Sequence, residues 1–171
     1  MRQTGLRAKA GSLAELDEEL THLRSRLERA FGPETAAPGF TGTARSTGHC
    51  AAVSVILNQI AGAQMVSAKV QGTSHWFNRL TVDGRQVDVD LTGDQFGLEP
   101  IRVANADSLH AETRIRSFAD LNNETIDRAA RLARRTGLSE VSEFLEGALE
   151  ERRSLDGQVT DRQGRDRRNS R

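Results

Sequence analysis

Leucine residues recur at spacings of three and four along residues 12–33, which predicts a helix with one apolar side. Ser12 and Glu15 form a capping box at its start, and Gly32 with the proline after it ends the helix. Residues 34–48 consist mainly of glycine, proline and small residues and are predicted to form a loop. The pattern thus indicates one amphipathic helix followed by a long connection.

A second helix is predicted from Cys50 to about residue 61, and it is apolar nearly all the way round. Ser46 and Thr47 are the candidates for its N-cap, and Gly62 follows its end. A helix with so little polar surface is typically buried. We therefore expect this helix to lie at the centre of the domain.

The pattern then changes to an alternation of apolar and polar residues, which is typical of strands. Three consecutive strands are predicted at 63–70, 74–82 and 85–91. Asp83 and Gly84 between the last two strands favour a two-residue type I′ turn. The three segments therefore form an antiparallel sheet.

Two more helices are predicted near the end of the chain, at 122–137 and 139–153. Residues 154–171 contain little apolar surface and are predicted to be disordered. The expected organisation is one α+β domain over residues 1–153, with the small sheet packed on the Cys50 helix and the other helices flanking it.

The two-residue turn fixes which side chains of the hairpin share a face. In that register Asp88 lies opposite Arg79 and is expected to pair with it. His75 and Asp90 are diagonal neighbours on the same face, ~7–8 Å apart, and are expected to make contact. The other face is expected to pack on the core, and Asn78 there needs a hydrogen-bond partner. Its residues are Trp76, Asn78, Leu80, Val82, Val87, Val89 and Leu91.

Composition narrows the classes of function. Lys and Arg together number 24, as do Asp and Glu, so the charge balance favours neither nucleic acid nor an anionic membrane surface. Acids interleaved in the arginine-rich segment 152–171 argue against a nucleic-acid tail. No run reaches the ~18 apolar residues of a membrane span, and no signal peptide is evident, so we expect a soluble cytoplasmic protein.

The single cysteine excludes an internal disulfide and a four-cysteine zinc site. A thiol at a helix N-terminus, beside an imidazole, has the surroundings that favour a thiolate nucleophile. We interpret Cys50 as nucleophile, His75 as base and acid, and Asp90 as the residue that orients the imidazole. The simpler alternative is that Cys50 fills space in the core and His75 is structural.

Further residues are candidates for contacts with substrate or oxyanion: Ser46, Thr47, His49 and Trp76. The backbone N–H of Cys50 is a candidate oxyanion donor. His22 is expected to face solvent, and His110 lies in an irregular segment without an evident partner. A metal site formed by His75, Asp88 and Asp90 is a less favoured alternative, because the Asp-x-Asp pattern is weak, and no metal or cofactor is expected.

The segments "GHCAAVSVILNQIAGAQMV", "SHWFNRL" and "DVDLTGDQF" resemble the bacterial YunG-like proteins over about residues 12–136. His49 stands where that family usually has glutamine. The order of Cys, His and Asp is similar to that of papain-like and transglutaminase-like enzymes, including arylamine acetyltransferases. The resemblance implies a papain-like α+β core with a thiol acyl-transfer centre.

We therefore expect a cysteine-dependent enzyme, either an amide or thioester hydrolase or an acyltransferase, that acts on a small-molecule or peptide acyl substrate. The alternative is a non-catalytic binding or regulatory module on a papain-like scaffold. The sequence leaves open whether the protein is a monomer or a homodimer.

Overall fold

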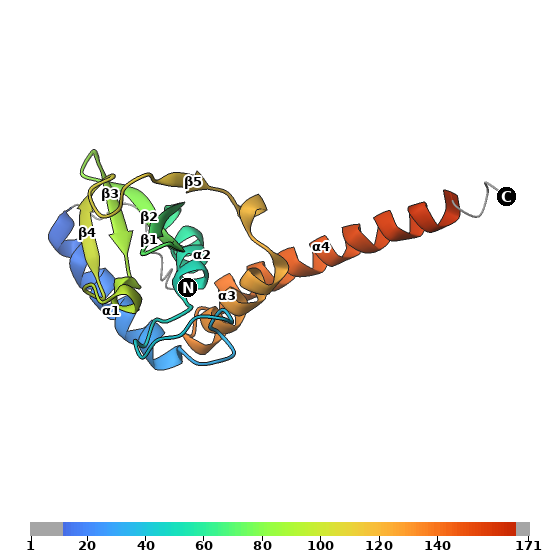
Figure 1. The fold of residues 1–171 in the computed structure, drawn as a ribbon, viewed down its shortest axis with the longest axis horizontal. Helices are drawn as coiled ribbons and strands as arrows, with labels where there is room; N and C mark the ends of the chain where they lie inside the picture. The colour runs from blue at the N-terminus through green and yellow to red at the C-terminus, as the bar shows by residue number, and fades with distance from the viewer. Residues whose placement is uncertain (1–11, 167–171) are drawn as a thin grey trace.

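A computed structural model of the protein describes the backbone of residues 12–166 and the side chains of residues 12–158. The helices are α1 (Leu13–Ala30), α2 (Cys50–Ala61), α3 (Asn123–Arg135) and α4 (Ser139–Asp166). The strands are β1 (Gln64–Val70), β2 (Thr73–Val82), β3 (Arg85–Asp90), β4 (Arg102–Asn105) and β5 (Arg114–Arg116). They form one antiparallel sheet in the order β4-β3-β2-β1-β5, so the predicted α+β class is confirmed (Figure 1).

The α1 helix begins and packs as the leucine pattern predicts. The Ser12 side chain accepts a hydrogen bond from the backbone N–H of Glu15, at 3.2 Å. The leucine stripe is buried from its second member onward, at Leu16, Leu20, Leu23 and Leu27. This stripe faces α2, so the first helix belongs to the main core.

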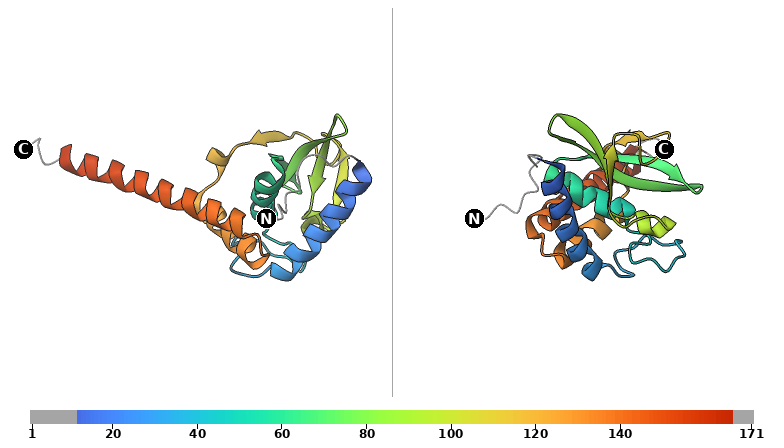
Figure 2. Two further views of the ribbon diagram at one scale, coloured as in Figure 1. Left: turned by 180° about the vertical axis from the view of Figure 1, so that it is seen from behind. Right: turned by 90° about the vertical axis from the view of Figure 1, so that its left-hand side faces the viewer.

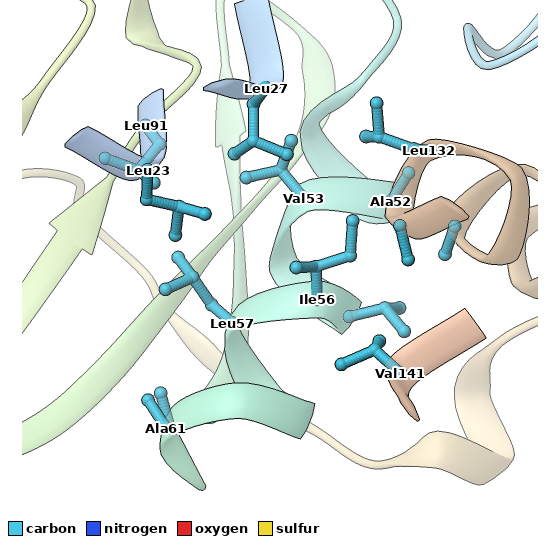
Figure 3. Packing of buried hydrophobic residues seen from close by; sticks show 14 of the residues in the cluster. Leu23, Leu27, Ala52, Val53, Ile56, Leu57, Ala61, Leu91, Leu132 and Val141 are labelled. Atoms are coloured by element: carbon cyan, nitrogen blue, oxygen red, sulfur yellow. The ribbon is translucent and has the colours of Figure 1, made fainter. Parts of the chain in front are cut away.

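The α2 helix is the central helix of the domain, as predicted. Figure 3 shows Leu23 and Leu27 of α1 beside Val53 and Leu57 of α2. The other helices and the inner face of the sheet complete the same apolar cluster. Burial of large aliphatic side chains on this scale is the main source of stability in a domain of this size.

The start of α2 differs from the prediction that Ser46 or Thr47 caps it. The N-cap residue is His49, and its side chain makes no capping hydrogen bond. The backbone N–H of His49 instead bonds to the carbonyl of Ser46, at 2.9 Å, after a left-handed turn at Gly48. Ser46 and Thr47, which the sequence spacing suggested as caps, are part of this turn instead.

The hairpin has the predicted register. Val82 pairs with Arg85 across a turn in which both central residues have positive φ, as a type I′ turn requires. Arg79 and Asp88 form two hydrogen bonds of 2.7 and 3.0 Å, as expected. All the predicted core-face residues are buried except Trp76, which is half-buried against the core.

Two reciprocal hydrogen bonds join β2 to the middle of α2. The Ser54 hydroxyl donates to the carbonyl of Phe77 at 3.0 Å, and the Asn78 side-chain amide donates to the carbonyl of Ser54 at 2.9 Å. Asn78 therefore has the partner that its place on the apolar face requires.

Strands β4 and β5 were not predicted. Each is a short edge strand: β4 pairs with β3, and β5 pairs with β1. Strands of three or four residues are too short to show a clear alternation. They nevertheless carry the connection around residues 106–113 across the sheet face that bears His75.

The α4 helix is longer than predicted, because it continues through residues 154–166, which we expected to be disordered. Val141, Leu145 and Leu149 anchor its first half in the core. Because the packed first half already supplies a helix nucleus, the further residues need only propagation, which costs less than nucleation, although 154–166 include two glycines and three aspartates. Its second half projects away from the domain (Figures 1 and 2). Residues 167–171 of the predicted tail lie outside the described residues.

Across the described helices, none combines the length and the apolar character needed to cross a membrane.

Candidate active site

Cys50 is the first residue of α2, and its side chain is only 5 % exposed. The thiol lies at the helix N-terminus, where the helix dipole favours negative charge. The Cys50 side chain lies close enough to the imidazole of His75 on β2 for a hydrogen bond and its negative charge to raise the pKa of that imidazole. The thiol and the imidazole, 25 positions apart in sequence, thus meet where α2 and β2 pack together.

The predicted contact between His75 and Asp90 is present, and both side chains are fully buried. Nε2 of His75 donates to Oδ2 of Asp90 at 2.8 Å. Oδ1 of Asp90 accepts a further hydrogen bond from the backbone N–H of Thr92 at 3.0 Å. Because Asp90 holds Nε2, the nitrogen left to exchange a proton with Cys50 is Nδ1.

Two opposing effects set the charge state of these groups. Burial lowers the pKa of His75, but hydrogen bonds to Asp90 and Cys50, together with their negative charges, raise it to about 9. Burial raises the pKa of Asp90, while hydrogen bonds from His110 and His75 and the positive charge of His75 hold it well below its usual range. The site therefore favours an imidazolium beside a carboxylate at neutral pH.

This raised pKa predicts a pH-dependent stability. The His75 contribution is fully present below its ordinary pKa of 6.5 and is lost as the pH rises through about 9, an effect of about 3 kcal/mol. Urea unfolding at pH 6 and pH 10 measures it. The wild type should lose about 3 kcal/mol more than the His75→Gln variant over this interval, and equal losses in the two proteins would contradict the expectation.

His110 is a site residue that the sequence did not reveal. Its Nε2 lies 3.1 Å from Oδ2 of Asp90, the same oxygen that accepts from His75. The His110 ring also packs against Phe77 and stands edge-on to His75, with centroid separations of 4.9 and 5.2 Å. No local pattern marks this residue, because the strand pairing that brings its loop to Asp90 is itself too short to predict.

Arg128 of α3 is a second residue that the sequence did not reveal. Burial lowers the pKa of this half-buried guanidinium, and the negative charges of Glu124, Asp127 and Cys50 oppose that effect. Arg128 also donates a hydrogen bond to the Thr125 hydroxyl at 3.0 Å. It is thus a positive charge within electrostatic range of the thiol, and no pattern in the sequence predicts that its helix lies there.

Ser46, one of the predicted substrate residues, holds two loops near the thiol together. The Ser46 hydroxyl donates to the carbonyl of Thr92 at 3.3 Å and is hydrogen-bonded to the carboxylate of Asp94. Asp94 also accepts a hydrogen bond from the buried guanidinium of Arg24 at 3.0 Å. Ser46 therefore ties the segment before Cys50 to the segment after Asp90.

His49 is buried, and both of its ring nitrogens are engaged. Nε2 lies 2.8 Å from the Thr35 hydroxyl, and Nδ1 lies 3.0 Å from the carbonyl of Thr47. Its ring lies against Phe31, with centroids 4.2 Å apart. Burial lowers the pKa of His49, although several backbone hydrogen bonds oppose this. The contacts place His49 as a support for the start of α2.

The fourth predicted substrate residue, Trp76, packs partly on the core, and the Arg116 guanidinium lies 5.7 Å from the centre of its ring.

The residues that could bind a metal in the structure differ from the predicted set of His75, Asp88 and Asp90. Asp88 pairs with Arg79 and with the backbone N–H of Asp107, so it does not join His75. The residues that come together are His75, Asp90 and His110, whose ligand atoms lie within 4.8 Å of one another. Two imidazoles and a carboxylate can bind a transition metal. Here the same atoms already form hydrogen bonds to one another.

A cleft of about 340 Å³ opens beside His75. Gln95 lines it and places its amide nitrogen 3.3 Å from Nδ1 of His75. Phe96 also lines it and lies edge-on to the imidazole, with centroids 4.9 Å apart. Thr47, three residues before Cys50, also lines the cleft. Neither His75 nor Cys50 lines the cleft, and the Gln95 side chain lies between the cleft and Nδ1 of His75.

The sequence profile of the YunG protein family matches residues 19–131, about two thirds of the chain. No curated protein and no solved structure shows significant similarity to this chain.

Proposed function

The chain belongs to the YunG protein family, and we propose that it is a cysteine-dependent acyl-transfer enzyme. The observation that carries the proposal is the Cys50–His75–Asp90 arrangement, with the thiol at a helix N-terminus and the imidazole between thiol and carboxylate. Thiol, imidazole and carboxylate in this order form the constellation that activates a sulfur nucleophile. The reaction would be hydrolysis of an amide or thioester, or transfer of its acyl group.

In the proposed reaction, the Cys50 proton already lies on Nδ1 of His75 in the thiolate–imidazolium pair, and the thiolate sulfur attacks the substrate carbonyl carbon. The backbone N–H of Cys50 at the helix start would stabilise the resulting oxyanion. His75 then gives its proton to the leaving amine or thiol, the bond to the leaving group breaks, and a thioester on Cys50 remains. Water or an acceptor, deprotonated by His75, attacks this thioester and releases Cys50.

Asp90 and His110 support this chemistry without touching the substrate. Asp90 fixes the tautomer in which Nδ1 faces the thiol. His110 donates a second hydrogen bond to Asp90, which helps keep the carboxylate ionised and fixed in place. We propose both as positioning residues for His75. The positive charge of Arg128 would in addition favour the thiolate electrostatically.

The papain-like core is part of the proposal. Its support is the chain order of nucleophile, base and carboxylate, together with a central helix that starts at the cysteine and an antiparallel sheet that carries the histidine. This arrangement resembles that of papain-like and transglutaminase-like enzymes.

One observation favours the alternative of a non-catalytic binding or regulatory module. Cys50 is nearly inaccessible and does not itself line the cleft. The partner surfaces of such a module would be α1 and the projecting part of α4. The contact between Cys50 and His75 weighs against this reading, because a space-filling cysteine has no need of a buried imidazole and carboxylate beside it.

A substrate panel separates the two functions. Wild-type protein and the Cys50→Ala variant are incubated with p-nitroanilides, acyl thioesters and p-nitrophenyl esters, with and without an arylamine acceptor. An enzyme should turn over at least one class at a rate that Cys50→Ala lowers by at least about 1,000-fold. Equal rates for both proteins on every class would support the module instead.

A further inference from the structure

We propose that the cleft beside His75 binds an uncharged group attached to the amide of the substrate. This inference rests on the proposed function, because it assumes that the acyl group reaches Cys50 from that cleft. It defines the substrate class further: a neutral carboxamide or peptide-like amide, rather than an acyl group that carries a carboxylate, phosphate or ammonium group close to the scissile bond.

The position of the cleft connects it to the thiol. Gln95 on its wall lies 3.3 Å from the His75 nitrogen that faces Cys50, and Phe96 contacts the same ring. Thr47, which also lines the cleft, precedes Cys50 by three residues. A substrate seated here would have its reacting carbonyl near the start of α2. The volume of about 340 Å³ lies at the small end of the range of ligand sites.

The lining of the cleft is uncharged, although 28 % of the residues in the chain are charged. Apolar contact comes from Pro38, Phe40 and Phe96, and polar contact comes from threonine and glutamine side chains. An ionised group placed there would lose hydration without gaining an ion partner. Phe40 and Phe96 instead suit the apolar part of a neutral group, and the threonine and glutamine side chains suit its polar part.

Two polar atoms on these walls lack a hydrogen-bond partner. They are the hydroxyl oxygen of Thr47 and the amide oxygen of Gln95, and both are shielded from solvent. A buried acceptor without a partner is unfavourable in the empty cleft. The Gln95 oxygen has no exposed surface, so the proposed contact requires the Gln95 side chain to turn toward the cleft. The N–H of an amide substrate would then supply the donor that this oxygen lacks, whereas an ester has no such donor.

A pair of opposite charges introduced at one position tests the inference. Thr41 lines the cleft, is exposed and lies outside the helices and strands, so Thr41→Lys and Thr41→Asp should both fold. The probes are N-benzyl iodoacetamide and its para-carboxylate and para-aminomethyl derivatives. Each alkylation rate at Cys50 is divided by the rate of the same probe with glutathione.

The wild type should prefer the neutral probe over both charged probes by at least 5-fold. Thr41→Lys should raise the ratio of anionic to cationic probe by at least 3-fold, and Thr41→Asp should lower it by as much. Thr81→Lys and Thr81→Asp, at the exposed far end of β2, are the matched controls and should change this ratio by less than 1.5-fold.

The amide itself is tested by comparing N-benzyl iodoacetamide with benzyl iodoacetate. Replacing the Gln95 amide in Gln95→Met should lower the normalised amide-to-ester ratio by at least 3-fold. This ratio cancels any change in the nucleophile that follows from the contact between Gln95 and His75.

These outcomes distinguish the two proposals. A wild-type Cys50 that reacts with no probe faster than glutathione does overturns the proposed function. If Cys50 is alkylated rapidly but neither Thr41 variant changes the ratio of anionic to cationic probe, the proposed enzyme function stands and the proposed role of the cleft is overturned.

Discussion

Replacing His75 with glutamine is expected to slow the alkylation of Cys50 by iodoacetamide at pH 6 by about 100-fold. The imidazolium that favours the thiolate is present at pH 6, because hydrogen bonds to Asp90 and Cys50 outweigh burial and raise the pKa of His75 to about 9. Without it Cys50 should behave as an ordinary thiol, which is almost entirely protonated at pH 6 and therefore reacts slowly. Mass spectrometry of the labelled protein over time gives the rate.

The pH profile adds a second readout. In the wild type the rate should stay high well below pH 8, whereas in His75→Gln it should fall about tenfold per pH unit below that value. His22→Gln is the matched control, because His22 is exposed on α1, as predicted, and its replacement should leave the profile unchanged. If the pH profile of alkylation in the wild type already matches that of an ordinary thiol, Cys50 is not activated and the proposal is wrong.

Replacing Asp90 with asparagine is expected to destabilise the fold by about 3 kcal/mol at pH 7. The carboxylate is fully buried and accepts hydrogen bonds from His75, His110 and the backbone and hydroxyl of Thr92. Asparagine has only one acceptor oxygen, so its NH₂ group would face either the two histidine donors or the backbone N–H of Thr92 and leave those donors without an acceptor. Urea unfolding at fixed pH measures the loss.

The pH dependence of this loss has a definite sign. The folded-state pKa of Asp90 is held below its ordinary value, so its contribution is present above pH 4 and disappears as the pH falls further. The difference between wild type and Asp90→Asn should therefore shrink on acidification. Asp83→Asn, in the exposed hairpin turn, is the control and should change stability by less than about 0.5 kcal/mol. An Asp90→Asn variant as stable as this control would contradict the expectation.

The sequence predicted the part of the site that depends on local rules. The Asp83–Gly84 turn set the hairpin register, and the register alone placed His75 beside Asp90 and Arg79 opposite Asp88. The α1 helix followed equally from its Ser12 cap and its leucine spacing, because these are local effects of backbone geometry. The roles of Cys50, His75 and Asp90 in a reaction remain predictions.

The features that escaped prediction depend on distant contacts. His110 reaches Asp90 through a loop between two edge strands that are too short to show a period. Arg128 comes near Cys50 only because α3 packs on α2. The length of α4 was missed because a polar segment was judged by itself, while in the chain it continues a helix whose first half is already packed.

The two hydrogen bonds between Ser54 and the Phe77–Asn78 segment affect the precision of the site. Ser54 follows Cys50 by four residues and lies on the same side of α2, and Phe77 follows His75 by two residues and lies on the same side of β2. These hydrogen bonds thus join α2 to β2 one helical turn from the point where the thiol and the imidazole meet. If the sheet flexes, Cys50 and His75 should move together, and the distance between the Cys50 sulfur and the His75 nitrogen should change little. Little reorganisation would then be needed before proton transfer.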